Sequence, residues 1–112
     1  MSRILAIVLL TVYSGRVLPA DPSDRGRNAI NKYGCAVCHR IPGIASPGGG
    51  IGPSLYDVTR RTYIAGSVPS GRDTMARWIQ HPQELRPGTV MPDLGVTSDE
   101  ARDITAYLYS GN

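Results

Sequence analysis

The 112-residue chain contains no phenylalanine, a single tryptophan and six tyrosines, so it has little aromatic bulk for a hydrophobic core. Lysine is almost missing as well, because Lys32 is the only one, and the arginines are spread along the chain. A nucleic-acid-binding protein would be expected to show a clustered Lys/Arg face. The composition therefore argues against nucleic acid as a partner.

The sequence also lacks any alternating apolar and polar run long enough for a β-strand, and it has no internal repeat. Three stretches instead show helical patterning, which predicts an all-α fold with three main helices. They cover 23–33, 70–81 and the segment from Thr97 to just before Gly111, with a further helical turn at 55–58.

Expected start and stop signals flank these helices. We expect Ser23 or Asp24 to cap the first helix, and Ser70 to cap the second, which Pro82 should end. Thr97 and Glu100 form a capping-box pattern at the start of the third.

The stretch from 40 to 55, between the first two predicted helices, is long, irregular and rich in glycine. Its glycines 48–50 and 52 match no phosphate-binding loop and are interpreted as a flexible surface turn.

Residues 1–20 resemble a secretory signal peptide. Arg3 precedes an uncharged run from Ile4 to Tyr13, which is too short to span a bilayer, and small Ala20 ends the segment. We expect cleavage before Asp21, leaving a single periplasmic domain over residues 21–112 with no membrane span.

Cleavage also changes the charge. Ten basic residues and nine acids would remain, so the formal charge would fall from +3 to +1. A domain of this size often needs a cofactor, a metal or disulfides to hold a stable core.

Both cysteines and one of the two histidines lie within five consecutive positions, Cys35 to His39. The pattern Cys-x-x-Cys-His is typical of covalent haem attachment, in which two thiols add to the vinyl groups of one porphyrin and the histidine ligates the iron. Three alternatives stay open: a disulfide, a redox-active dithiol, and a zinc site completed by His81.

A second axial iron ligand could come from Met75, His81 or Met91. Met75 lies in a helical apolar stripe and is expected in the core. His81 ends a predicted helix, where a polar residue is favoured by the helix dipole. Met91 lies in the proline-bounded loop RPGTVMPDLG, which could hold its thioether rigidly toward a cofactor. We therefore predict Met91 as the ligand.

These motifs, in this order, resemble those of the class I c-type cytochromes over nearly the whole of residues 21–112. GCAVCH resembles the attachment site, GPSL the proximal loop, and WIQHPQELRPGTVMP the distal segment. The segment from Arg60 to Tyr109 is most similar to cytochrome c domains fused to subunit II of some bacterial terminal oxidases. The resemblance implies a small cytochrome c fold around one covalently bound haem c.

The resemblance also implies roles for individual residues. The carbonyl of Pro53 would accept a hydrogen bond from His39, and Leu55 would pack on the haem. Trp78 stands where relatives offer a tyrosine hydroxyl near the methionine, and Thr89 leads to the axial Met91.

The haem propionates would need charge-assisted hydrogen bonds. Arg60 or Arg61, Thr89 and Trp78 are the candidates to hold them. The lysine-rich docking face of mitochondrial-type relatives is absent from this sequence.

The expected function is periplasmic electron transfer in a respiratory chain, by a monomeric monohaem carrier with His39 and Met91 as axial ligands. We do not expect an enzyme. Its partners would be redox proteins such as a terminal oxidase or a dehydrogenase. Two alternatives remain: a haem subunit held permanently in such a complex, and a haem peroxidase or gas sensor that lacks a firm distal ligand.

Overall fold

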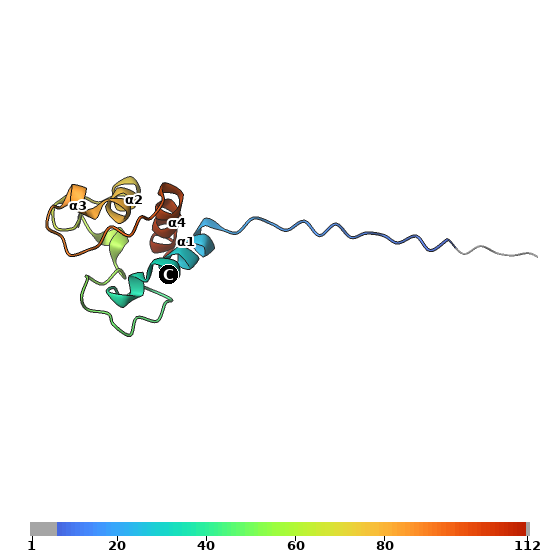
Figure 1. Cartoon of the computed structure of the whole chain (residues 1–112), viewed down its shortest axis with the longest axis horizontal. Helices are drawn as coiled ribbons and strands as arrows, with labels where there is room; N and C mark the ends of the chain where they lie inside the picture. The colour runs from blue at the N-terminus through green and yellow to red at the C-terminus, as the bar shows by residue number, and fades with distance from the viewer. Residues whose placement is uncertain (1–6, 112) are drawn as a thin grey trace, which may run out of the picture.

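The computed structural model describes residues 7–111, which form a small, mostly helical body (Figure 1). The predicted all-α class is confirmed, with four α-helices and two very short strands in this range. In chain order the elements are α1 (Pro22–Tyr33), the 3₁₀ turns η1 (Cys35–Val37) and η2 (Val58–Arg60), β1 (Tyr63–Ile64), β2 (Val68–Pro69), α2 (Arg72–Gln80), α3 (Pro82–Leu85) and α4 (Ser98–Leu108).

The N-cap of helix α1 lies two to three residues before the predicted cap. Its N-cap is Asp21, whose carboxylate accepts a hydrogen bond from the peptide N–H of Ser23 at 2.9 Å. Pro22 is the first helical residue, where its fixed φ suits the helix and its missing N–H costs nothing. The predicted caps, Ser23 and Asp24, therefore lie inside the first turn.

The start of α2 also differs from the prediction. Its N-cap is Gly71, which makes no side-chain hydrogen bond, so Ser70 does not cap this helix. Thr74 in the first turn instead donates its hydroxyl to the carbonyl of Pro69 at 2.8 Å. The helix ends at Gln80, one residue before the predicted end at His81, and Pro82 opens the short helix α3 as its first residue.

Helix α4 begins with the predicted capping box. The Thr97 hydroxyl accepts from the peptide N–H of Glu100 at 3.2 Å, and the Glu100 carboxylate accepts from the peptide N–H of Thr97 at 3.3 Å. The two reciprocal bonds satisfy donors that a helix start otherwise leaves free.

Helices α1 and α4 cross and pack against each other (Figure 1). Gly26 makes the crossing possible, since a Cβ there would lie 1.9 Å from the backbone oxygen of Asp103. The buried residues around this contact include Ile30, Ile104 and Tyr107, and the Tyr107 hydroxyl donates to the carbonyl of Pro42. Helix α2 packs against α4 and completes the helical body.

The strands β1 and β2 form a small antiparallel hairpin that the sequence did not predict. Its turn contains Ala65 and Gly66, both with positive φ. Two-residue strands are too short to produce an alternating pattern. The predicted turn at 55–58 lies slightly later in the chain, as η2.

Residues 7–20 form neither helix nor strand and extend away from the helical body (Figure 1). The apolar side chains in this stretch are exposed, as at Leu9, Leu10 and Val12. Nowhere in residues 7–111 does a helix have the length and apolar content needed to cross a membrane.

Candidate haem site

The Cys35 to His39 segment follows directly from the end of α1. Gly34 ends that helix in the left-handed conformation, with φ 69°, and turns the chain into η1. The peptide N–H groups of Cys38 and His39 both point to the carbonyl of Cys35, at 3.3 and 3.0 Å. One tight turn therefore carries both thiols and the imidazole.

The two cysteine thiols are free and half-buried, so no disulfide joins Cys35 to Cys38. Burial raises the pKa of the Cys35 thiol above its ordinary value. A raised pKa lowers the thiolate fraction, which is the opposite of what a redox-active dithiol requires.

The zinc alternative has no ligand set in the described structure. Across residues 7–111, no three Cys, His, Asp or Glu side chains are grouped so that they could hold a metal ion.

His39 is oriented by the loop that follows it. Its Nδ1 lies 2.7 Å from the carbonyl oxygen of Pro53. Because a carbonyl can only accept, Nδ1 carries the proton and Nε2 keeps its lone pair. A histidine held in this way presents Nε2 as a ligand.

Gly52 lies against the face of the His39 imidazole. A Cβ at this position would be 2.5 Å from Cε1 and 2.7 Å from Nδ1 of the ring. The interpretation of Gly52 as part of a flexible turn is therefore wrong, because its missing side chain makes room for the imidazole. The sequence signal was present in its position directly before Pro53.

Backbone hydrogen bonds fix this proximal loop to the Cys35–His39 turn. The peptide N–H of Gly52 donates to the carbonyl of Cys38 at 2.8 Å, and that of Leu55 donates to the carbonyl of Arg40 at 2.8 Å. Leu55 is half-buried and packs against the core. The two thiols, the imidazole and the proximal loop thus form one unit.

Met91 lies in the irregular chain after α3 and is half-buried. Its peptide N–H points to the Thr89 hydroxyl at 3.4 Å, and its carbonyl accepts from the side-chain amide of Gln83 at 2.6 Å. Gln83 lies within the distal segment WIQHPQELRPGTVMP, but no motif there predicts this contact. Within residues 7–111, no hydrogen bond joins this distal segment to the proximal loop.

The two other candidate ligands occupy different environments. Met75 is 6% exposed and belongs to the hydrophobic core, as predicted. His81 is exposed at the junction of α2 and α3. Only Met91 combines partial burial with a position in an irregular segment.

The propionate candidates also differ from one another. Arg61 donates to the carbonyl of Ser54, which follows Pro53, whereas the Arg60 side chain is exposed and makes no hydrogen bond or ion pair with any residue from 7 to 111. Trp78 is half-buried against the core, and its indole N–H has no partner in the same range. Arg61 is therefore the arginine attached to the proximal loop.

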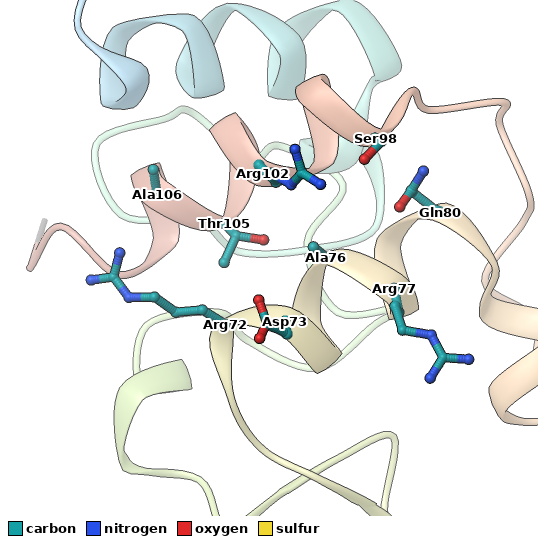
Figure 2. Close-up of a pocket in the computed structure, with 9 residues that line it drawn as sticks. All are labelled: Arg72, Asp73, Ala76, Arg77, Gln80, Ser98, Arg102, Thr105 and Ala106. Atoms are coloured by element: carbon teal, nitrogen blue, oxygen red, sulfur yellow. The ribbon is translucent and has the colours of Figure 1, made fainter.

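A separate groove of about 470 Å³ lies between α2 and α4 (Figure 2). Three arginines border it, at positions 72, 77 and 102, and in Figure 2 the Arg72 and Arg77 side chains extend in opposite directions. None of the predicted haem-site residues lines this groove.

Comparisons with known proteins agree with this geometry. The family model described as "Cytochrome c" matches residues 23–112. Proteins named "Cytochrome c2" are similar: that of Rhodopila globiformis is 33% identical over 108 residues, covering 84% of this chain and 96% of that protein. That of Rhodoblastus acidophilus is 36% identical over 102 residues, covering 79% and 90%.

A protein of a different name also matches. "Cytochrome c oxidase subunit 2" of Alkalihalophilus pseudofirmus is 32% identical over 89 residues, covering 79% of this chain. The chain spans only a quarter of the length of that relative, 25%. Taken with the family model and the Cys-x-x-Cys-His turn, these matches show that the chain belongs to the cytochrome c family, as a class I c-type cytochrome with covalently attached haem c that serves in electron transfer.

Proposed function

We propose that the chain is a periplasmic electron carrier in which Cys35 and Cys38 form the thioether links and His39 and Met91 are the axial ligands. The observation that carries the proposal is the 2.7 Å contact between Nδ1 of His39 and the Pro53 carbonyl. This contact fixes the tautomer that a ligating histidine needs, with Nε2 free to bind.

The bound haem supplies an iron that cycles between the ferrous and ferric states and so carries one electron. The chain's own residues set the conditions for that cycle. Pro53 and Gly52 hold the orientation of His39. A methionine opposite a histidine raises the reduction potential, so Met91 would favour the reduced state.

The axial ligands are tested by absorption spectra of the purified ferric and ferrous holoprotein. In the resembled family, a weak long-wavelength ferric band reports a methionine sulfur on the iron. We expect the wild type to show this band and Met91→Ala to lose it. Met75→Leu is the matched control, because it replaces a core methionine with a side chain of similar volume. Haem without the band in the wild type would contradict His39 and Met91 ligation.

Carbon monoxide binding by the same preparation distinguishes an electron carrier from a peroxidase or gas sensor. A carrier with both axial positions filled binds carbon monoxide slowly in the ferrous state. Rapid binding by the wild type would favour the enzyme or sensor function instead.

A second candidate function is supported by the match to the oxidase subunit. The chain could serve as a haem subunit bound permanently to a respiratory complex, performing the same electron transfer. Size-exclusion chromatography of a gently extracted native preparation distinguishes the two, since a free carrier runs as a monomer and a subunit elutes with the larger complex.

The periplasmic location depends on removal of residues 1–20. We propose that the mature chain starts at Asp21, the N-cap of α1. Mass spectrometry of the intact periplasmic protein tests this, and a mass that includes residues 1–20 would contradict it.

A further inference from the structure

The backbone N–H and the backbone carbonyl of Met91 each contact a side chain. Its carbonyl oxygen accepts from Nε2 of Gln83 at 2.6 Å, and its N–H reaches the Thr89 hydroxyl at 3.4 Å. The second contact is beyond the usual range for an N–H···O bond, and the first is short. Gln83 therefore provides the stronger of the two restraints on Met91.

Gln83 is itself well anchored. It is the second residue of α3, whose first residue, Pro82, is fully buried. The peptide N–H of Arg86 donates back to the carbonyl of Pro82 at 2.9 Å, and the Arg86 guanidinium donates to the carbonyl of Ala65 in the β1–β2 turn at 3.0 Å. The backbone that carries Gln83 is thus fixed at both ends of α3.

The chain between α3 and Met91 has no such support from regular structure. One turn bond stabilises it, from the peptide N–H of Thr89 to the carbonyl of Arg86 at 3.1 Å. The bond from Gln83 closes this segment into a loop by joining its last residue to α3. Without that bond, the loop would have more freedom to move Met91 away from a cofactor.

We propose that Gln83 is a positioning residue for Met91: its side-chain amide holds the Met91 carbonyl and so disfavours replacement of the Met91 thioether by outside ligands. This inference depends on the axial role of Met91 proposed above. Gln83 does not touch the iron and acts only through the backbone of Met91.

The test titrates ferric holoprotein with imidazole at neutral pH and follows the loss of the long-wavelength band. Gln83→Leu keeps a similar side-chain size and helix propensity but removes the donor. Gln83→Glu keeps the side-chain length but faces the Met91 carbonyl with acceptors only. We expect imidazole to bind both variants about 2- to 5-fold more tightly than the wild type, the effect of losing one exposed neutral hydrogen bond.

Glu84→Leu is the matched control. Glu84 is the next residue of α3, and its exposed side chain makes no hydrogen bond or ion pair with residues 7–111, so its replacement should leave the imidazole affinity unchanged. An equal increase in Glu84→Leu would assign the effect to α3 as a whole and overturn the role of Gln83.

Two further outcomes are distinguishable. If the wild type and both Gln83 variants show the band and bind imidazole equally, the inference about Gln83 fails while Met91 ligation stands. If the wild type lacks the band, the proposed ligation fails first.

Discussion

Nδ1 of His39 lies 2.7 Å from the carbonyl oxygen of Pro53, and the backbone of Gly52 covers the face of the same imidazole. The ring is therefore positioned by a loop that lies more than ten residues further along the chain. No side chain at positions 52 and 53 takes part, since a carbonyl and the absence of a Cβ do the positioning.

Gly52→Ala should disturb this arrangement. The new Cβ would lie 2.5 Å from Cε1 of the imidazole, so the ring or the loop has to shift. We expect the holoprotein to lose about 1–3 kcal/mol of unfolding free energy, as for other overpacked sites. Denaturant unfolding of the ferric holoprotein measures this.

Gly71→Ala is the control for that measurement. Gly71 has an extended φ of 173°, and its added Cβ would meet nothing closer than 3.5 Å. A loss in Gly71→Ala as large as that in Gly52→Ala would show that the contact with His39 is not the cause.

Gly26→Ala should weaken the crossing of α1 and α4. The added Cβ would lie 1.9 Å from the Asp103 carbonyl oxygen, a backbone atom that can move only with its helix. We expect a loss of about 3 kcal/mol or more, at the upper end for overpacking. Asn28→Ala, on the exposed face of α1, should by contrast unfold at nearly the wild-type denaturant concentration. Equal stability of the two variants would contradict this account of the crossing.

Glu100 should stabilise the fold above about pH 4.5 and cause part of the loss of stability below that pH. Its carboxylate accepts from the Tyr33 hydroxyl at 2.6 Å, from Lys32 at 2.9 Å and from the Thr97 hydroxyl at 2.9 Å. These bonds lower the pKa of Glu100 from 4.5 to about 2. The lowered pKa means that its contribution is fully present above about pH 4.5 and is lost as the pH falls toward 2.

The comparison of wild type with Glu100→Gln checks this. Unfolding midpoints measured from pH 6 to pH 2 should differ most above pH 4.5 and converge toward pH 2. Glu84→Gln should follow the wild type throughout. A difference that stays constant down to pH 2 would show that ionisation of Glu100 is not responsible.

Electron transfer with a redox partner should depend only modestly on salt. After removal of residues 1–20 the chain would carry +1, and two haem propionates would bring the reduced holoprotein near −1. Long-range steering is weak at such a charge, so we expect the second-order rate to change less than about tenfold between low and physiological ionic strength.

A steep fall in that rate with salt would contradict the argument from net charge. The local cause to examine would be the three arginines at the α2–α4 groove (Figure 2). Replacing Arg72, Arg77 and Arg102 by glutamine would then show whether this groove steers the partner.

The features that sequence reasoning predicted best are those encoded by neighbouring residues. The Thr97 and Glu100 capping box and the Cys35 to His39 turn each lie within a few positions, and the structure forms both as local units. The buried position of Met75 follows equally from its helical spacing.

The features that were missed depend on distant contacts or on a weaker local signal. Gly52 is needed because it meets His39, a distant residue, and within its own loop only the adjacent Pro53 indicates this role. The role of Gln83 was not predicted because its partner, the Met91 carbonyl, is a backbone group that every residue carries, so no residue pattern marks it. The Asp21 cap could have been found, since Pro22 is a common first residue of a helix.

The crossing of α1 and α4 joins the two ends of the domain, because one helix starts at Pro22 and the other ends at Leu108. Joining segments so far apart requires closure of a long loop, with its entropic cost, before the contact can form. A chain emerging from the ribosome or from a membrane channel cannot complete this core until its last helix is free. Folding of this domain is therefore a late event. The Cys35 and Cys38 thiols stay outside a completed core until α4 has packed against α1.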